Sequence, residues 1–336
     1  MDLTGKRILF FHVPNYGYHE VMMDSFRKLG AEVDDFDTRP SHSFLTKALI
    51  RINRDLLGPM IDKYHNDIID GVKDKQYDII YFYKGEAVSA QTMERLKSLY
   101  PNAYFVLYFP DSIRNNTGAR KIIPYFNDCY TFDKEDTKEY NIRFLPLFYS
   151  DNMRDIANAG KDCKYDLFFV GTVHSDRYNF IRKIVDQYAS KGRKSFTWFY
   201  FPSKVLYYKM CIENSVVRKA PYSEFRFTTL TGQQTAEALA ESRVVLDIQH
   251  PKQTGLTMRT IETLGAKKKL ITTNTQITGY DFYNPHNILV VDRSNPIIPD
   301  EFIMTEYEDI PGDVYDKYYI DNWVNALLSE YSNGSK

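Results

Sequence analysis

The sequence has few cysteines, no marked excess of charge and no long hydrophobic run. Its three cysteines, Cys129, Cys163 and Cys211, are widely spaced and form no CxxC pair, which excludes a disulfide framework or a zinc site of the usual spacing. The formal net charge of -1 argues against a protein that mainly coats nucleic acid. The longest apolar runs, "IIYFY" and "YFVLYF", have the length of strands and are too short to span a membrane.

Several short motifs are also missing. The first residues, MDLTGKRILFF, lack the pattern of a secretory signal, and with so few cysteines we expect a cytoplasmic protein. No G-x-G-x-x-G fingerprint of a dinucleotide site occurs. No two histidines have metal-ligand spacing. We therefore expect neither a metal ion nor a tightly held cofactor.

The chain has ample apolar sequence, arranged in alternating segments. With 336 residues, of which 43% are hydrophobic, it is long enough for two folded domains. Strand-like runs alternate with helix-like stretches, and this alternation predicts an α/β protein with two doubly wound, Rossmann-like domains. The expected strands are "RILFFHV", "AEVDDFD", "YDIIYFYKG", "AYFVLYFPDS", "DCYTFD" and "IRFLPLFY", followed by "YDLFFVGTV", "FTWFYFP", "RVVLDIQHP" and "KKLITTN".

A polar stretch, residues 150–164, separates the two halves of this pattern. We expect an N-terminal domain over 1–150 and a C-terminal domain over 164–317, facing each other across a cleft. The final segment, 318–336, reads as a helix that can pack back on the first domain, because its apolar residues recur on one face.

The segment "FLTKALIRINRDLL" in the first half mixes apolar residues with Lys47, Arg51 and Arg54. Such a helix could lie on a membrane surface, where its charges would contact the lipid headgroups. It could equally be an ordinary amphipathic helix that covers the sheet. The sequence leaves both readings open.

The stretch "RVVLDIQHPKQTGLTMRTIETLGAKKKLITTN" predicts a strand, a loop, a helix from about Thr257 and a further strand. Ligands of open parallel sheets bind beyond the carboxyl ends of the strands. In the first turns of this helix, Arg259 and Glu262 project one turn apart, where the helix dipole favours a phosphate. Arg259 could bind the phosphate and Glu262 a ribose diol. The alternative is an intrahelical ion pair on a solvated face.

Histidines fall at three of these expected strand ends, namely His12, His174 and His250. A single histidine is usually a hydrogen-bonded structural residue, although imidazole can also transfer protons near neutral pH. In the loop before the helix, Gln249 and His250 could hold sugar hydroxyls or phosphate.

The stretch "TGLTMRTIETLGAKKKLITTN" resembles the donor-binding segment of GT-B glycosyltransferases, in particular the CgeB-like group with a family-1-type C-terminal domain. "YDLFFVGTVHSDRYNFI" is similar to the first strand and loop of their C-terminal domain. "YFYKG", "LYFPDS" and "TFDKEDTKEYNIRFLPLFY" are similar to their N-terminal domain. The resemblance therefore touches both halves in the correct order, and it implies a GT-B-like fold.

This resemblance also implies roles for particular residues. Glu262 would bind the nucleotide ribose and Arg259 the diphosphate, with Gly171, Thr172 and Arg177 near the phosphates. Helix dipoles and basic groups would take the place of a metal ion, in keeping with the absence of a D-x-D segment from the expected donor loop.

The chain also departs from the pattern. Many GT-B enzymes have a second glutamate eight residues before the ribose-binding one, and here that position is Thr254, so a retaining mechanism does not transfer directly. The remaining expected donor-site residues are His174, Gln249, His250, Gly255 and Thr257.

An inverting transferase needs a base for the acceptor hydroxyl. Asp111, which follows the strand "AYFVLYFP", is the leading candidate, although an aspartate at such a place can simply cap the next turn. His19 and Glu86 are the competing candidates.

These observations predict a glycosyltransferase that moves a sugar from a nucleotide-sugar donor to a saccharide or lipid-linked acceptor. The resemblance places the reaction in cell-surface or exopolysaccharide assembly, with peripheral association at the inner face of the membrane left open. Two alternatives remain: a nucleotide-sugar epimerase of similar architecture, and a non-catalytic scaffold that binds sugar nucleotides.

Overall fold

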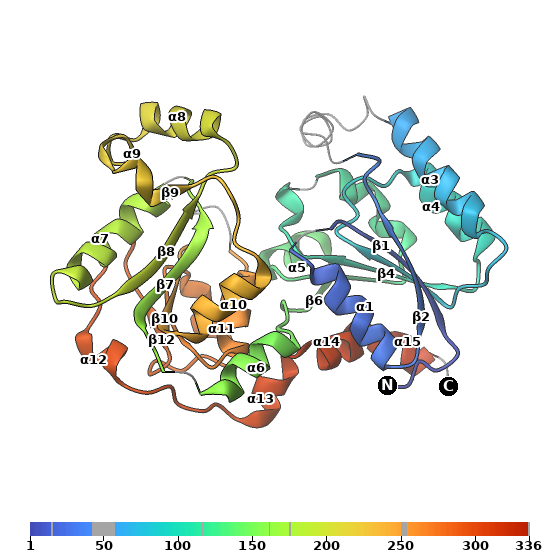
Figure 1. Ribbon diagram of the computed structural model, residues 1–336. Helices are drawn as coiled ribbons and strands as arrows, with labels where there is room; N and C mark the ends of the chain where they lie inside the picture. Colours follow the sequence, from blue (N-terminus) through green and yellow to red (C-terminus); the bar gives the residue numbers. More distant parts are fainter. Residues whose placement is uncertain are drawn as a thin grey trace. The chain divides into compact units, whose positions relative to one another are not determined.

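The computed structural model describes residues 1–14, 16–41, 58–115, 117–160, 162–174, 176–249 and 254–334. The segment "FLTKALIRINRDLL" lies outside these residues. The chain forms two compact units (Figure 1). The first unit consists of Met1–Leu147 and Ile320–Lys336, and the second of Phe148–Tyr319. The division thus falls just before the polar stretch at 150–164, and the C-terminal segment belongs with the first unit.

The first unit contains a six-stranded sheet in the order β2-β1-β3-β4-β5-β6, in which all neighbouring strands are parallel. Its strands are β1 (Arg7–His12), β2 (Glu32–Asp37), β3 (Ile79–Tyr83), β4 (Tyr104–Phe109), β5 (Asp128–Thr131) and β6 (Arg143–Phe144). Its helices are α1 (Tyr18–Lys28), α3 (Gly58–Val72), α4 (Ala90–Leu99), α5 (Lys134–Tyr140), α14 (Ile320–Leu327) and α15 (Ser329–Gly334), with 3-10 turns at Ile113–Asn115 and Thr117–Tyr125.

Helices cover both faces of this sheet because its central strands are apolar on both sides. All five residues of β3 are buried. Alternate side chains of the strands, such as Phe11 and Phe82, pack in one core with Met93 and Leu96 of α4. Residues of opposite parity face α1, where the Phe10 and Phe26 rings lie 6.3 Å apart. A sheet buried on both faces has continuous apolar strands, and this is the pattern in the sequence.

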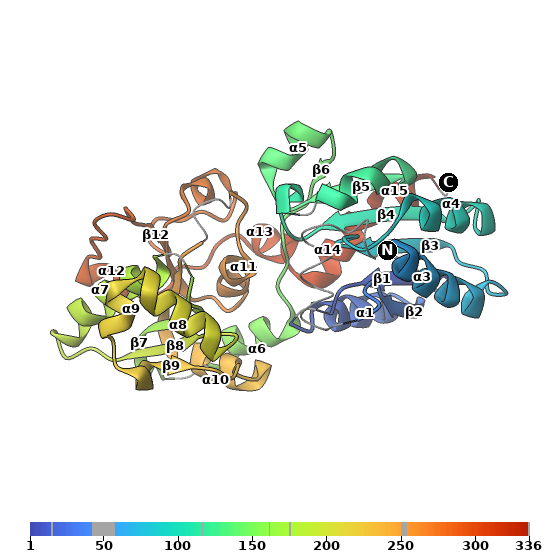
Figure 2. The same ribbon diagram turned by 90° about the horizontal axis from the view of Figure 1, so that it is seen from above.

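The C-terminal helix α14 lies beside α1 in both views of the chain (Figure 1, Figure 2). Its Trp323 is 1% exposed, donates its indole N–H to the Pro146 carbonyl at 2.7 Å, and lies edge-on to Tyr108 with ring centroids 4.8 Å apart. Asp321 accepts a hydrogen bond of 2.7 Å from Ser25 of α1. The helix ends at Leu327, and α15 continues from Ser329, so the expected single helix is divided in two.

The second unit contains a parallel six-stranded sheet in the order β12-β11-β10-β7-β8-β9. Its strands are β7 (Tyr165–Thr172), β8 (Ser195–Tyr200), β9 (Phe225–Arg226), β10 (Ser242–Asp247), β11 (Lys269–Thr272) and β12 (Ile288–Val290). Its helices are α6 (Asp151–Ala159), α7 (Arg177–Ala189), α8 (Lys204–Glu213), α9 (Ser215–Lys219), α10 (Gly232–Ala240), α11 (Met258–Gly265), α12 (Asp300–Met304) and α13 (Gly312–Lys317), with 3-10 turns at Tyr222–Glu224 and Thr275–Gly279.

Helix α7 covers one face of the second sheet, and α6, α10 and α11 gather on the other (Figure 1). Local sequence explains where several of these helices begin. Thr231 and Gln234 form a reciprocal capping box at the start of α10. The Thr257 hydroxyl caps α11 by accepting from the Thr260 N–H.

The predicted α/β class with two doubly wound parallel sheets is confirmed. The short strands β9 and β12 were not predicted, because two or three residues carry too little pattern to be recognised. Of the helices that the structure describes, none combines the length and the hydropathy that a membrane span requires.

Candidate functional site

The carboxyl ends of β7, β10, β11 and β12 form one edge of the second sheet, because all of these strands are parallel. Most of the residues expected to bind a donor lie at this edge. Gly171 and Thr172 end β7, Arg177 begins α7, and Gln249 follows β10. His250 lies outside the described residues. This edge is the place where open α/β sheets bind ligands.

Arg177 is held at this edge by main-chain oxygens. Its guanidinium donates to the Ile248 carbonyl at 2.6 and 2.9 Å and to the Thr172 carbonyl at 3.2 Å. Burial, followed by the nearby Arg259 cation, lowers the pKa of Arg177 to about 10. Among the described residues, no carboxylate forms an ion pair with it. Its charge is therefore only partly compensated.

Arg259, in the first turn of α11, reaches the same place from the other side. Its guanidinium donates to the Val170 carbonyl and lies 5.3 Å from the centroid of the Phe169 ring. No ion pair joins it to a carboxylate within the part of the chain that the structure describes, so the alternative of an intrahelical pair with Glu262 is not what holds it. Two guanidinium groups thus meet at the end of β7, each bonded to main-chain carbonyls.

Gly171 leaves room for these groups. A Cβ at this position would lie 3.5 Å from Nη1 of Arg177 and 3.0 Å from the Phe169 ring. The glycine lies within β7 and not in a turn. The contact with the Phe169 ring is the tight one, whereas 3.5 Å from the guanidinium is an ordinary van der Waals distance, so a side chain here would displace the ring first.

A third arginine, Arg293, lies beyond β12 and was not anticipated from the sequence. It donates to both carboxylate oxygens of Asp176 at 2.6 and 2.8 Å and to the Gln249 carbonyl at 3.1 Å. This bidentate pair joins the loop after β7 to the loops after β10 and β12. A charge-assisted bidentate contact fixes geometry well, so the pair holds the edge in shape.

Asp247, the last residue of β10, was also missed. It is 3% exposed and accepts hydrogen bonds from the Thr257 hydroxyl at 2.5 Å and the Thr260 hydroxyl at 2.7 Å. A carboxylate beside the first turn of a helix is stabilised by the helix dipole. Asp247 therefore fixes the start of α11 and, through it, the position of Arg259.

The loops after β10 and β11 are tied together by side chains. The Thr273 hydroxyl donates to the Gln249 side chain at 2.8 Å, and the Asn274 amide donates to the carbonyls of Thr254 at 3.1 Å and Gly255 at 3.4 Å. Gly255 is buried, so its contribution is through the backbone. Asn274 was not predicted, although it ends the motif "LITTN".

Glu262 and His174 are both partly buried, on α11 and in the loop after β7 respectively. Glu262 lies one turn beyond Arg259 on α11. His174 accepts the Arg177 N–H through its carbonyl at 3.2 Å and thereby begins the turn into α7. Both residues belong to the two elements that carry the arginines.

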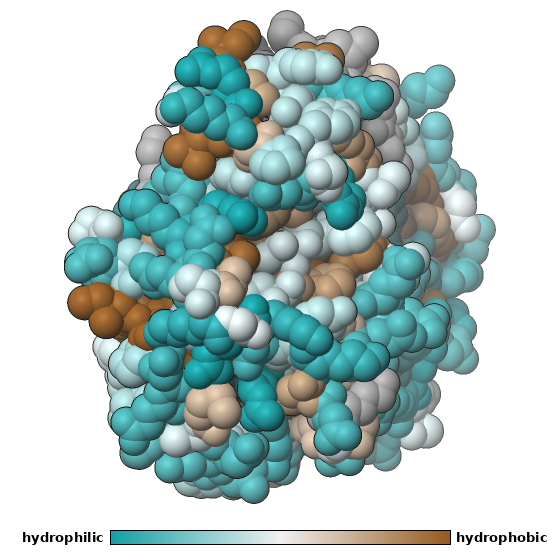
Figure 3. Space-filling model, turned by 60° about the vertical axis from the view of Figure 1, so that its left-hand side comes forward, coloured by the Kyte–Doolittle hydropathy of each residue, from teal (hydrophilic) through white to brown (hydrophobic). Residues whose placement is uncertain are grey.

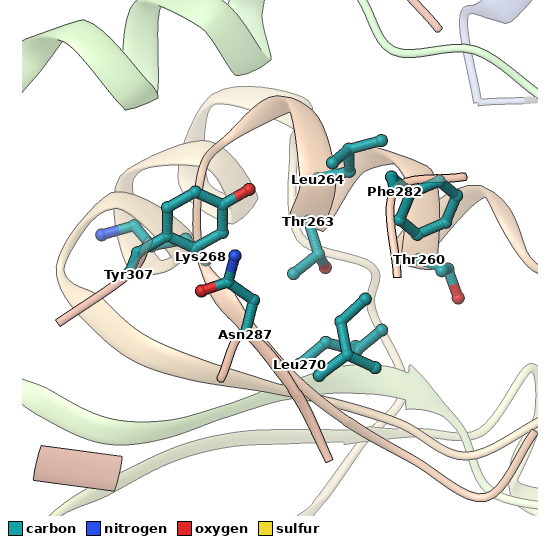
Figure 4. A pocket seen from close by; sticks show the side chains of 9 residues that line it. Thr260, Thr263, Leu264, Lys268, Leu270, Phe282, Asn287 and Tyr307 are labelled. Atoms are coloured by element: carbon teal, nitrogen blue, oxygen red, sulfur yellow. The ribbon is translucent and has the colours of Figure 1, made fainter. Parts of the chain in front are cut away.

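A small cavity lies beside α11, and neither Arg177 nor Arg259 lines it. It is lined by Thr263 and Leu264 of α11 together with Lys268, Asn287 and Tyr307 (Figure 4). Its volume of about 10 Å³ is the space of a single water molecule. It cannot hold a nucleotide.

The first unit has its own polar cluster at the carboxyl edge of its sheet. Glu86, which follows β3, receives hydrogen bonds from both Nε at 2.8 Å and Nη2 of Arg39, and its other oxygen lies 3.0 Å from Nζ of Lys84. These side chains are only 10 to 17% exposed. Burial opposes ionisation of Glu86, but Lys84 and Arg39 outweigh it and hold the pKa of the carboxyl below its usual range. A carboxylate stabilised in this way is a weak base.

Asp111 lies on the same edge, after β4, and is more accessible. Its side chain is 44% exposed, one oxygen accepts the Ser112 N–H at 3.0 Å, and the other lies 3.9 Å from Lys84. This contact with the adjacent N–H is not a helix cap, since the N–H of Ile113, where the 3-10 turn begins, donates to Asp136 at 2.9 Å.

His19 of α1 stacks on His12 of β1, with ring centroids 4.2 Å apart and planes at 25°. His12 is 4% exposed, and its Nε2 lies 2.9 Å from a carboxylate oxygen of Asp35. Burial lowers the pKa of His12; the hydrogen bond to Asp35 opposes this shift without reversing it, and the adjacent His19 lowers the pKa further. The structure thus joins His19 to a histidine–aspartate pair, whereas Glu86 and Asp111 share Lys84.

No protein-family model and no curated protein sequence matches this chain. Several solved structures do. A glycosyltransferase from Rickettsia africae is 14% identical, and the match covers 99% of each chain with a TM-score of 0.55. A UDP-forming α,α-trehalose-phosphate synthase from Burkholderia xenovorans, solved with glucose-6-phosphate, is 9% identical over 97% of this chain and 100% of that one, with a TM-score of 0.62.

A UDP-GlcNAc 2-epimerase from Methanocaldococcus jannaschii, solved with UDP-GlcNAc and UDP, is 9% identical over 97% of this chain and 99% of that one, with a TM-score of 0.53. At these identities the likeness concerns the fold. With its two six-stranded parallel sheets, the chain is an α/β protein of GT-B-like architecture.

Proposed function

We propose that this protein is a glycosyltransferase that uses a nucleotide-sugar donor, with the donor diphosphate at the carboxyl edge of the second sheet. The observation that supports this most is the pair of guanidinium groups, Arg177 and Arg259, held against main-chain carbonyls at the end of β7. Neither guanidinium forms an ion pair with a carboxylate among the described residues, and two such neighbouring cations are stabilised by a bound anion. A diphosphate has the charge to compensate both.

In this proposal the two arginines stabilise the charge that develops on the leaving diphosphate. The first turn of α11 adds the positive end of its helix dipole, although the buried Asp247 already uses part of it. Glu262, one turn further along α11, accepts from the ribose hydroxyls. Gly171 and Thr172 line the phosphates, while His174, Gln249, Gly255, Thr257 and the undescribed His250 complete the donor site.

For the base, we propose Asp111, with His19 and Glu86 as alternatives. The 44% exposed side chain of Asp111 supports this choice, because a general base must reach the acceptor hydroxyl. The ion pairs that stabilise ionised Glu86 count against it. The observation that supports His19 is the stacking of its ring on His12.

The finer parts of the proposal rest on the sequence resemblance. They are membership of the CgeB-like group, a cytoplasmic location, a saccharide or lipid-linked acceptor, and a role in cell-surface or exopolysaccharide assembly. The matched proteins whose names include UDP or UDP-GlcNAc support a nucleotide sugar as the donor class.

The test is nucleotide binding, measured by calorimetry and thermal shift with UDP, GDP, CMP and dTDP, because a ligand that binds the native state raises its stability. We expect one nucleoside diphosphate to bind selectively, and Arg259→Gln to weaken it by about 10- to 100-fold, the value of a charge-assisted hydrogen bond. Glu262→Ala should weaken the binding of the nucleoside alone as well as the binding of the nucleoside diphosphate, because both contain the ribose.

The matched control is Arg182→Gln on α7, which removes an arginine that pairs with Asp186 at 2.8 Å and is 37% exposed. It should bind like the wild type. No binding of any nucleotide at millimolar concentration, or unchanged affinity in Arg259→Gln, would overturn the donor site.

The epimerase remains the second candidate, because three of the matched structures are UDP-GlcNAc 2-epimerases with TM-scores above 0.5. An epimerase changes the sugar of its nucleotide sugar without an acceptor, whereas a transferase releases the nucleotide when an acceptor is added. A protein that binds the nucleotide sugar and does neither is the non-catalytic scaffold.

A further inference from the structure

The outward face of α8 is apolar. Val205 is 77% exposed, Tyr208 60% and Ile212 79%. Their spacing of three and four residues places them on one side of the helix. Exposed single apolar residues are common in proteins, but a stripe of three large ones along a single helix face is not.

Helix α8 is fixed in this orientation by its opposite face. Tyr207 is 7% exposed, and its ring packs against Phe201 at 5.4 Å, Phe225 at 5.3 Å and Tyr222 at 5.3 Å between centroids. Turning the helix to bury Ile212 would expose Tyr207. The apolar stripe is thus a consequence of how α8 is anchored and is not relieved by rotation.

The apolar area continues beyond the stripe. Leu206 of α8 is 44% exposed, Val216 of α9 42% and Tyr222 48%. In the space-filling view, hydrophobic and hydrophilic side chains lie next to each other at the top of the molecule, over α8 and α9 (Figure 3). We call this region the α8–α9 surface, defined by Val205, Leu206, Tyr208, Ile212, Val216 and Tyr222.

Positive charge surrounds the α8–α9 surface. Lys204, Lys209, Arg218 and Lys219 are all exposed, whereas Glu213 is the acidic residue within the two helices. The whole chain has a net charge of -1, so this excess is local. Exposed apolar and aromatic residues interspersed with lysine and arginine are suited to bind a lipid surface. The headgroup layer of such a surface can be negatively charged, and the region beneath it is apolar.

A groove lies beside α9, with a volume of about 350 Å³. Arg182 and Lys219 line it together with Val216. Arg182 is compensated by Asp186 at 2.8 Å and Glu224 at 3.4 Å, but Lys219 forms no ion pair with any residue that the structure describes. The groove therefore offers a cation next to an exposed aliphatic side chain.

We propose that the α8–α9 surface docks the protein on a membrane that contains anionic lipids. Val205 and Ile212 enter the boundary of the acyl chains, Tyr208 lies at the headgroup level, and the lysines contact lipid phosphates. Because α8 begins directly after the carboxyl end of β8, the membrane lies at the same edge of the second sheet as the arginines. Docking is independent of the transferase proposal, since it needs no donor.

The test is co-sedimentation of the full chain, without nucleotide, with vesicles of phosphatidylcholine alone or mixed with phosphatidylglycerol. We expect binding to the mixed vesicles that weakens as salt is raised. Val205→Ser combined with Ile212→Ser should reduce the partition coefficient at least about tenfold, because two aliphatic side chains no longer enter the lipid. Lys209→Gln combined with Lys219→Gln should reduce it by roughly tenfold or more on anionic vesicles.

The matched control is Ile297→Ser, which removes an aliphatic side chain that is 70% exposed but lies outside this surface. It should partition like the wild type. The variants should unfold at the wild-type temperature, because none of the changed side chains is buried. Absence of wild-type binding to the mixed vesicles, or equal binding by the Val205/Ile212 variant, would overturn the proposal. Self-association of the wild type would also overturn the proposal if the Val205/Ile212 variant abolishes the self-association but still binds the vesicles.

Discussion

Replacing Glu86 by glutamine tests whether this residue stabilises the first unit or acts as a base. Glu86 is the shared partner of Arg39 and Lys84, in a cluster whose side chains are only 10 to 17% exposed. The substitution keeps the shape but removes the charge, so it leaves two largely buried cations facing a neutral amide. Removing one member of a buried ion pair typically costs about 3 to 5 kcal/mol.

Some water reaches these side chains, so we expect a loss of about 3 kcal/mol in the free energy of unfolding, at the low end of that range. This corresponds to a fall of roughly 6 to 12 °C in the Tm of the first unit. The surface pair of Arg7 and Glu32, whose side chains are 36% and 69% exposed, provides the control. Glu32→Gln should cost about 1 kcal/mol or less.

The effect should depend on pH in a defined direction. The pKa of Glu86 in the folded protein lies below its usual range, so the ionised carboxylate stabilises the native state at every pH above the unfolded pKa, which is about 4.3. That contribution is lost as the pH falls through the folded pKa. The difference between wild type and Glu86→Gln should therefore be constant near pH 7 and shrink below about pH 4.

The assays are thermal unfolding, which gives the Tm, and chemical unfolding, which gives the free energy of unfolding, both followed by circular dichroism across this pH range, with turnover measured on the same variant. An unchanged Tm at pH 7, or a difference that does not shrink in acid, would refute the account of Glu86 as a buried counter-ion. Full stability with complete loss of turnover would make Glu86 the base in place of Asp111.

Three further predictions follow from the other contacts. Gly265→Ala should destabilise the second unit by about 1 to 3 kcal/mol in urea unfolding, because the new Cβ would lie 2.7 Å from Cβ of Tyr149. The control Gly232→Ala, whose new Cβ meets open space, should leave the stability unchanged. Equal effects of the two substitutions would contradict the predicted clash. In an NMR titration, His12 should show a pKa below its ordinary value of about 6.5, because burial lowers it. Acidification below neutral pH should therefore reduce the stability of the folded protein. A pKa at the ordinary value would contradict this account of a buried ring. Asp111→Asn should keep nucleotide affinity and lose about 10²- to 10⁴-fold in turnover, and full turnover would exclude it as the base.

The fold class of this protein can be predicted from its amino-acid sequence. Runs such as "IIYFY" are apolar without interruption, and a strand can be so only if both of its faces are covered, as they are in a doubly wound parallel sheet. The helix starts that carry Arg177, Arg259 and Glu262 were also predictable, because a carboxyl strand end can be recognised from a strand followed by a helix.

The contacts that hold those residues depend on the packing of distant segments and could not be predicted from the sequence. Arg293 and Asp176 are 117 positions apart, and Arg39 and Glu86 are 47 apart, so no local pattern relates them. The strand before Arg293 has only three residues, too few to mark its end in the sequence. Hydropathy periodicity reports which side of an element is buried, whereas the partner of a charge depends on which distant loops the sheet order brings together.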